Sequence, residues 1–266
     1  ASSSGGLFIA IAKKVIADGG VVFGARFDSK WSVIHSYADT LEGVKNFMGS
    51  KYVQSRIGKT FSEAKGFLKE RRKVLFTGTS CQIAALKNFL QKDYDNLLTI
   101  DVICHGVPSP MVWRRYLDEL KENAHEDVKK NTVLLHSKPH IFRGDAPLSK
   151  NNYEIKSISF RDKRLGWKKI SFALTLAKAL ADGKQNSVSL SHIYSNNPYM
   201  KLFLNDYILR PSCYQCPVKG GRSQSDITIA DYWGIEDQHP EIDEVWNGIG
   251  LLITNTRKGE EYIKGM

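Results

Sequence analysis

The sequence predicts an α/β fold: a mixed sheet with parallel strand and helix units in the N-terminal half, and an antiparallel, β-rich second part. The apolar runs KVLFTGT (73–79) and LLTIDVI (97–103) each end in a turn and are followed by an amphipathic stretch. Such alternation places neighbouring strands parallel in one sheet. After about residue 125 the pattern changes, because IKSISFR (155–161) and KISFALTLA (169–177) follow each other with no helical stretch between them.

The first element is a helix from residue 7, because Leu7, Ile11 and Val15 recur at helical spacing before a pair of glycines. Two strands follow, at 21–27 and 31–38, with a turn at Asp28 and Ser29 between them. The remaining expected elements follow in chain order: a polar loop at 47–58, helices at 61–72, 82–90 and 111–123, a helix at 198–209, strands at 226–234 and 249–256, and a helix at 257–264.

The length of 266 residues and the hydrophobic content of 42% support a substantial core. We expect residues 1–125 to form an α/β cofactor-binding part. Residues 126–266 are expected to form a β-rich part with a helix that leads to a CxxC loop. The two parts should pack as one globular unit.

The chain is basic, with 38 Lys and Arg against 28 Asp and Glu, a formal charge of +10. This balance favours anionic partners such as phosphorylated cofactors, nucleic acid or an acidic protein. No nucleic-acid motif is legible, which disfavours nucleic acid. No apolar run approaches the roughly 20 residues that a membrane-spanning helix needs.

The four cysteines are few for a secreted protein, and no signal peptide is visible, so we expect reduced thiols and a cytoplasmic location. The chain opens at Ala1 without a methionine, which indicates a processed product or a piece of a longer chain.

The cysteines form the most specific chemical pattern. Cys81 and Cys104 each follow a predicted parallel strand, so they should lie at the same edge of the sheet, while Cys213 and Cys216 form a CxxC turn. Three interpretations stay open on spacing alone: an iron–sulfur cluster, a structural zinc ion, or disulfides and unrelated core cysteines. His105 could replace a thiolate, although a histidine before a helix is more often a simple hydrogen-bonding residue.

Five ordered segments carry a family resemblance: GTSCQIAALKNFL, DVICHGVPSPMVW, SFRDKRLGW, RPSCYQCPVKGGRSQSDITIADYWGIE and GLLITNTRKG. With them the chain resembles the coenzyme F420 hydrogenase/dehydrogenase beta-subunit family. The resemblance implies a flavoprotein that binds FAD and a 4Fe–4S cluster, with Cys81, Cys104, Cys213 and Cys216 as cluster ligands. Two departures are the absence of an N-terminal ferredoxin-like segment and Ser80, where the family usually has proline.

Candidate cofactor-binding residues fall into groups. Serines and glycines before the first helix, or an ordinary serine cap, could face the FAD pyrophosphate, and the polar loop could join them. Threonines at the sheet edge either bind a ligand or cap the strand. The basic cluster of Arg161, Lys163 and Arg164 either holds an acidic cofactor tail or a phosphate, or forms a solvated hairpin. The aromatic residues after 231 either stack on the flavin ring or belong to the core. The residues are Ser3, Ser4, Gly5, Gly6, Ser50, Lys51, Tyr52, Thr77, Gly78, Thr79, Gln82, Arg161, Lys163, Asp231 and Trp233.

The resemblance implies an iron–sulfur flavoprotein oxidoreductase. Electrons would pass from a hydride carrier, with coenzyme F420 as candidate substrate, through FAD and the cluster to a redox partner protein or a ferredoxin-like domain. No side chain is obliged to act as an acid or a base, so no catalytic residue is assigned. The alternative is a zinc-stabilised binding module without redox activity.

Overall fold

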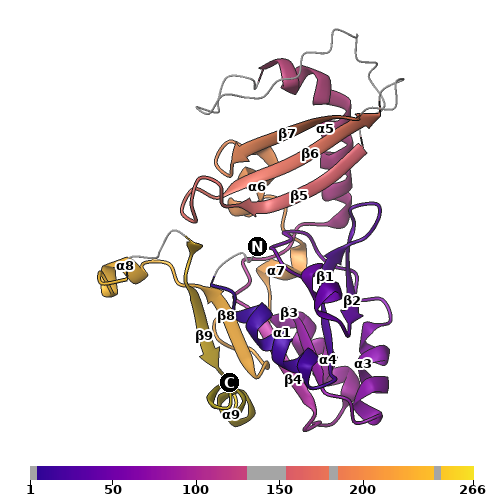
Figure 1. Ribbon diagram of the computed structural model, residues 1–266, viewed down its shortest axis with the longest axis vertical. Coiled ribbons are helices and arrows are strands. Elements are labelled where there is room, and N and C mark those ends of the chain that lie inside the picture. The colour runs from indigo at the N-terminus through magenta and orange to yellow at the C-terminus, as the bar shows by residue number, and fades with distance from the viewer. Residues whose placement is uncertain (1–4, 131–153, 180–184, 243–246) are drawn as a thin grey trace.

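The computed structural model describes residues 5–130, 154–179, 185–242 and 247–266 (Figure 1). The described helices are α1 (Leu7–Ala17), α2 (Leu41–Lys45), α3 (Thr60–Lys69), α4 (Ser80–Leu90), α5 (Pro110–Lys130), α6 (Pro198–Leu204), α7 (Pro211–Tyr214), α8 (Ile235–Gln238) and α9 (Arg257–Lys264). The described strands are β1 (Val21–Phe27), β2 (Val33–Ala38), β3 (Val74–Thr79), β4 (Leu97–Val102), β5 (Glu154–Asp162), β6 (Ser171–Ala179), β7 (Gln185–Ile193), β8 (Ile227–Asp231) and β9 (Gly250–Thr254).

The larger sheet has six strands in the order β2-β1-β3-β4-β8-β9. Its four inner strands run parallel, and the edge strands β2 and β9 are antiparallel to their neighbours. The mixed α/β sheet predicted from the sequence is therefore confirmed.

Helices cover both faces of this sheet. On one face, Ile11 and Val15 of α1 pack with Val44 of α2 against strand residues such as Leu75, and α9 adds to the same cluster. On the other face, α3 and α4 pack against a second set of strand residues that includes Phe76. Strands buried on both faces read as continuous apolar runs, which explains why β3 and β4 were legible in the sequence.

The smaller sheet is antiparallel, in the order β5-β6-β7, and lies above the larger one in Figure 1. It packs against α5 and α6 through a core that includes Trp113, Phe160 and Tyr199. Val33 and Val53, which belong to the first part of the chain, lie in this same core. The two sheets are therefore joined by shared packing, and β8 and β9 return from the second part to complete the larger sheet. The division of the chain at residue 125 stays a prediction.

The structure differs from the sequence prediction at several elements. The helix predicted at 198–209 ends at Leu204, because Asp206 takes a left-handed conformation (φ 66°) and the Tyr207 amide donates to the Leu202 carbonyl. A separate short helix, α7, then carries Cys213. The strand β7 was not predicted, because its serine-rich sequence has few apolar residues.

Helix bounds also shift at three places. The helix predicted at 61–72 runs from Thr60 to Lys69. The helix after β3 begins at Ser80 rather than at residue 82, since the Gln82 side chain turns back to accept a hydrogen bond from the Thr79 amide (3.0 Å). The helix predicted at 111–123 runs from Pro110 to Lys130. The short helices α2 and α8 had no counterpart in the prediction.

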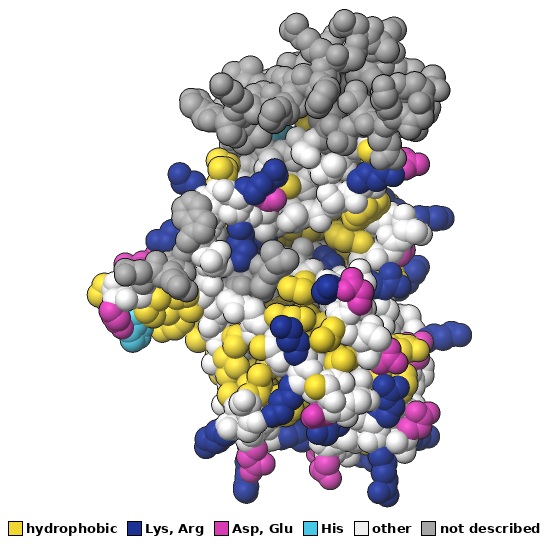
Figure 2. All heavy atoms as spheres, in the orientation of Figure 1, with side chains coloured by type: hydrophobic (Ala, Val, Ile, Leu, Met, Phe, Trp, Pro, Cys, Tyr) yellow, Lys and Arg dark blue, Asp and Glu magenta, His cyan; other side chains and the backbone are white. Residues whose placement is uncertain are grey.

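Basic side chains are spread widely over the molecule. Figure 2 shows Lys and Arg side chains scattered across the face in view rather than gathered into one patch. Within the described part of the chain, no helix combines the length and the apolar character that crossing a bilayer requires.

Candidate functional site

A cavity of about 870 Å³ lies at the carboxyl edge of the parallel strands, beneath the smaller sheet. Residues at the ends of β3, β4 and β8 line it, together with the start of α1, the loop before Val53 and residues of α6. The carboxyl edge of a parallel sheet is where α/β proteins bind ligands. The volume falls within the range of cofactor sites.

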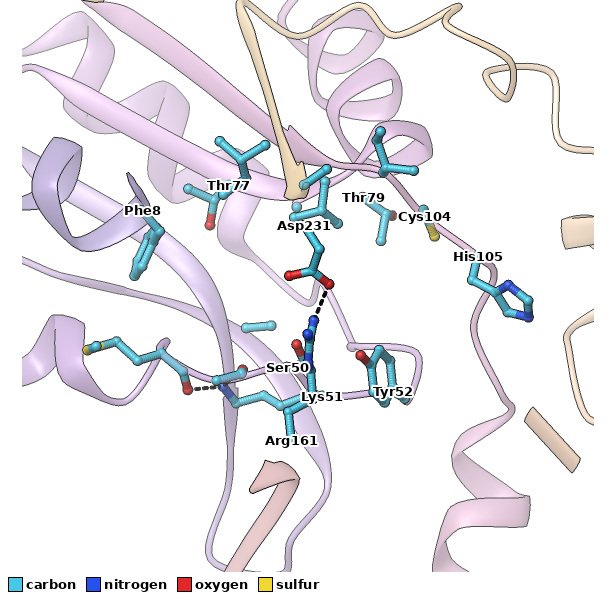
Figure 3. A pocket seen from close by; sticks show the side chains of 18 of the residues that line it. Phe8, Ser50, Lys51, Tyr52, Thr77, Thr79, Cys104, His105, Arg161 and Asp231 are labelled. Carbon is cyan, nitrogen blue, oxygen red and sulfur yellow. Dashed lines mark hydrogen bonds and ion pairs between the residues drawn. The ribbon is translucent and has the colours of Figure 1, made fainter. Parts of the chain in front are cut away.

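Lys51 projects into this cavity from the polar loop (Figure 3). Its ammonium donates to the carbonyl oxygens of Phe47 (3.3 Å), Met48 (2.9 Å) and Gly49 (2.9 Å). Burial lowers the pKa of Lys51 from 10.5 to about 8. The loop therefore holds a cation whose charge no carboxylate in these contacts neutralises.

Arg161 faces Lys51 from the smaller sheet and pairs with Asp231 at the end of β8 (Figure 3). Arginine Nη1 lies 2.5 Å from aspartate Oδ2, and the two side chains are 7% and 16% exposed. Arginine Nε and Nη2 are buried and have no hydrogen-bond partner among the described residues. We call Lys51, Tyr52, Arg161 and Asp231 the cationic wall.

Tyr52 completes this wall from the same loop as Lys51. Its ring stacks on Phe203 of α6 with 4.8 Å between ring centroids, and its backbone carbonyl accepts a hydrogen bond from the Tyr199 hydroxyl (2.8 Å). Burial raises the pKa of the Tyr52 hydroxyl, so the side chain stays neutral near pH 7. The loop is thus fixed to the helix beside the cavity.

A chain of hydrogen bonds holds the turn between β3 and α4. His35 Nε2 donates to the Thr77 carbonyl (2.9 Å), and His35 Nδ1 lies 2.8 Å from the Ser55 hydroxyl. The Gln82 side chain donates to the same hydroxyl (2.8 Å) and accepts from the Thr79 amide. Burial lowers the pKa of His35, which favours the neutral ring that can donate at one nitrogen and accept at the other.

The prediction that Cys81 and Cys104 share one sheet edge is confirmed. They follow β3 and β4, which are parallel neighbours, while Cys213 lies in α7 and Cys216 just beyond it. Desolvation, with smaller contributions from charge on the other three thiols and opposed by a hydrogen bond with the Gly106 backbone, raises the pKa of the Cys104 thiol to about 11. The other three thiols therefore lie within electrostatic reach of Cys104. We call the four cysteines the thiol corner.

All four cysteines are free thiols, so the disulfide interpretation is wrong. Across the described ranges, no group of three or more His, Cys, Asp or Glu side chains is arranged to hold a metal ion. The ligand role of the cysteines stays a prediction. The donor chemistry fits a cluster, because four soft sulfur ligands that repel one another as thiolates are stabilised by a metal centre.

A buried carboxylate joins β4 to the segment that follows Cys216. Asp101 of β4 is fully buried, and it accepts hydrogen bonds from Ser223 (2.5 Å), Ser225 (2.8 Å) and Thr228 (2.6 Å). Cys104 follows Asp101 closely, and the three hydroxyls belong to the segment after Cys216. The network therefore joins the strand that precedes Cys104 to the segment that follows Cys216.

Most of the predicted cofactor residues line the cavity: Gly5, Gly6, Ser50, Lys51, Tyr52, Thr77, Gly78, Thr79, Gln82, Arg161, Asp231 and Trp233, with Cys104 beside them. Ser3 and Ser4 lie outside the described residues. The first helix is capped by Gly6, with φ 87° and no side-chain hydrogen bond, so the simple serine cap is wrong. Lys163 is absent from the described lining, and its ammonium donates to the Asn247 carbonyl (2.7 Å).

Trp233 forms part of the cavity but not of the protein core. It is 54% exposed and stacks on the buried Trp167, with ring centroids 4.2 Å apart and an interplanar angle of 13°. Sequence reasoning had not paired these two rings. It also missed His35, whose only signal was a polar residue on the buried side of an alternating strand.

His105 makes local contacts instead of joining the cysteines. Its Nε2 lies 2.8 Å from Asp206 Oδ1 and 3.3 Å from the Phe203 carbonyl. These contacts agree with the simple hydrogen-bonding role rather than with a metal ligand.

The structure thus defines an α/β protein with a cofactor-sized cavity, lined in part by cationic side chains, at the carboxyl edge of its parallel strands. Residues 71–266 match the family model that describes the C terminus of the coenzyme F420 hydrogenase/dehydrogenase beta subunit, and the chain belongs to this family. Membership indicates an oxidoreductase-related role.

A solved structure has a similar fold. A chain of the F420-reducing NiFe hydrogenase complex from Methanosarcina barkeri superposes with a TM-score of 0.53 at 15% identity, covering 99% of this chain and 72% of that chain. No curated protein matches.

Proposed function

We propose that this chain is the flavin-binding and electron-transferring subunit of an oxidoreductase. FAD would occupy the cavity, and a 4Fe–4S cluster would be held by Cys81, Cys104, Cys213 and Cys216. When bound, the flavin supplies the conversion between a two-electron hydride donor and single electrons. Family membership supports this proposal.

The observation that carries the proposal is that the cavity is lined both by cationic side chains and by one of the four cysteines. Its lining includes the cationic wall and also Cys104 of the thiol corner. An anionic dinucleotide suits the wall, because the unpartnered nitrogens of buried Arg161 call for acceptor atoms. Gly5, which lines the cavity, is set by packing within the protein, since a Cβ there would lie 2.7 Å from the Gly250 backbone nitrogen of β9.

The residues of this chain position the ligand rather than transfer protons. Lys51 and Arg161 supply positive charge, and Tyr52, Phe203 and Trp233 supply apolar and aromatic surface that excludes water. The hydrogen-bonded turn at Thr79 and Gln82 fixes the sheet edge beside Cys81. Proximity of flavin and thiol corner would let electrons pass without a mobile carrier.

Anaerobic reconstitution tests this proposal. Purified chain is incubated with FAD, iron and sulfide, and bound flavin, iron and zinc are then measured. We expect one flavin and about four irons per chain, the content of one 4Fe–4S cluster. One zinc without flavin affinity would replace the proposal by the zinc-stabilised binding module.

The electron donor is proposed to be a deazaflavin hydride carrier of the coenzyme F420 type. The family name and the F420-reducing complex support this choice. Anaerobic titration of the flavin-loaded chain with reduced coenzyme F420 should bleach the flavin absorbance near stoichiometry. Bleaching by NADH, with none by the deazaflavin, would overturn the choice of donor.

The acceptor is proposed to be a partner protein or ferredoxin-like domain that docks beside the thiol corner. Ile103, Tyr207 and Tyr214 are 64%, 76% and 53% exposed, and they neighbour the segments that carry Cys104 and Cys213. The proposal assigns these exposed side chains to the interaction surface, because exposed apolar surface beside a functional site commonly serves to bind a partner. The multi-subunit hydrogenase complex that contains the structural neighbour supports a partner of this kind.

A further inference from the structure

The Arg161 side chain is buried, but only part of its hydrogen-bonding capacity is used. Its side chain is 7% exposed, and its single ion pair joins Nη1 to Asp231. Nε and Nη2 have no hydrogen-bond partner within the described ranges. Removing such donors from water without a partner is costly, so a protein rarely leaves them in this state without a ligand to complete them.

The two unpartnered nitrogens lie on one edge of the guanidinium. The Nε and Nη2 edge is one of the forks with which arginine binds two oxygens of a phosphate or carboxylate group. Asp231 occupies the other end of the guanidinium and so fixes its plane. Arg161 also lines the cavity, as Figure 3 shows. The fork is therefore held in position for an oxyanion.

The charge around the fork agrees with this interpretation. Lys51 adds a second cation to the same wall, and Asp231 is the one carboxylate among the described lining residues. Lys168 also lines the cavity, but it pairs with Glu236. Asp231 carries one negative charge against the two positive charges of Lys51 and Arg161, so an anionic group of a ligand would neutralise the remaining positive charge.

We propose that Arg161 is the phosphate-recognition residue of the cavity, whose Nε and Nη2 edge binds two oxygens of the ligand's phosphate group. The inference rests on the proposed function in one respect, that the ligand is a flavin. It adds specificity: the chain should discriminate a phosphorylated flavin from riboflavin through this one side chain. Lysine cannot replace it, because an ammonium offers no planar fork.

The test compares FAD, FMN and riboflavin binding to the wild-type chain, Arg161→Lys and Arg161→Gln, by quenching of flavin fluorescence. Arg161→Lys should weaken FAD and FMN binding roughly 10- to 100-fold and Arg161→Gln at least as much, while riboflavin changes less than about threefold. Equal losses for riboflavin and FAD would make Arg161 a structural residue, and unchanged FAD affinity would also overturn the proposal.

Arg164→Lys is the matched control. Arg164 lies on the same hairpin, its side chain is 58% exposed, and it pairs with Asp162. Its replacement should leave the affinity for all three flavins unchanged. Thermal unfolding of each variant shows whether the fold is retained.

A measurement on the wild-type chain removes the dependence on variants. Inorganic pyrophosphate should compete with FAD and leave riboflavin binding unaffected, and a failure to compete with FAD would overturn the proposal. If the wild type binds no flavin at all, the proposed function fails. In that case ADP binding that Arg161→Lys weakens would retain the phosphate assignment, and no ADP binding would overturn it.

Discussion

The cationic wall lines the cavity and the thiol corner reaches it through Cys104, yet the two regions are built differently. The wall is fixed by direct contacts: Lys51 is held by three carbonyl groups and Arg161 by Asp231. The corner brings together free thiols that raise the pKa of Cys104, and no described group is arranged as a metal site. The difference teaches that protein contacts alone hold the wall in place, whereas in the corner, under the proposed function, the cluster would draw the sulfurs together.

Replacing one corner cysteine should give the largest effect and separate the two regions. Cys104→Ser should abolish cluster loading, with iron falling from about four to below one per chain, because one of four thiolate ligands is lost. FAD affinity should change less than about threefold, since the wall is intact. Iron analysis and flavin titration of the same sample measure both.

His105→Asn is the control for this change. Its side chain contacts Asp206 and the Phe203 carbonyl, so iron loading should be kept. If His105→Asn lost iron while Cys104→Ser kept it, the cysteine assignment of the corner would be contradicted.

Replacing the buried carboxylate of Asp101 should give the next largest effect. Asp101→Asn introduces an amide among hydroxyls that donate to the carboxylate, and it should lower the free energy of unfolding by about 2 to 3 kcal/mol. For a chain of this size that corresponds to a fall in Tm of roughly 5 to 10 °C. Calorimetry of ligand-free protein measures it, with the exposed Asp95→Asn as control.

The same variant also tests whether the thiol corner and the cationic wall depend on each other. We expect Asp101→Asn to reduce iron loading more than FAD affinity, because the network joins the strand that precedes Cys104 to the segment that follows Cys216. Equal losses of both would show that the wall and the corner form one cooperative unit.

FAD binding at the cationic wall should depend on pH through the protonation of Lys51. Because the pKa of Lys51 is lowered to about 8, its charge is lost as pH rises through that value, and FAD affinity should fall about tenfold between pH 7 and 9.5. Lys51→Gln should remove this pH dependence, and the exposed Lys30→Gln should keep it. A pH-independent wild type would show that the positive charge of Lys51 does not stabilise the bound anion.

The same group affects stability in the opposite direction. In the unfolded chain the lysine keeps its proton up to about 10.5, whereas in the folded chain it releases the proton from about 8. The unfolded state therefore binds more protons in this window, and the stability of the ligand-free protein should gain from Lys51 as pH rises from 8 to 10.5. Denaturant unfolding of the wild type and Lys51→Gln isolates this contribution.

The smallest effect is expected at the mouth of the cavity. Trp233→Ala removes a half-exposed ring that stacks on Trp167, and it should weaken FAD binding by a few-fold, in keeping with about 0.5 to 1.5 kcal/mol for one aromatic pair. Tyr207→Ala, an exposed aromatic residue outside the described lining, is the matched control. A loss as large as that of Arg161→Lys would mean that stacking, not phosphate binding, dominates affinity.

Much of the larger sheet was legible because its strands are apolar on both faces. The runs that became β3 and β4 have no competing interpretation, and their order fixed the shared edge of Cys81 and Cys104. In the smaller sheet, β7 was missed because its serine-rich alternation gives a weak signal. The end of α6 was misplaced because a left-handed Asp206 cannot be read from helical periodicity.

The sequence by itself determined the types of residues in the site and the parallel strands that carry them, since those depend on composition and short-range periodicity. Only the tertiary structure decided how residues far apart in the chain meet. It placed Arg161 with Asp231 and stacked Trp167 on Trp233, and it left Lys163 outside the described lining of the cavity. Such pairings follow from long-range packing of two sheets around one cavity, and no local sequence pattern encodes them.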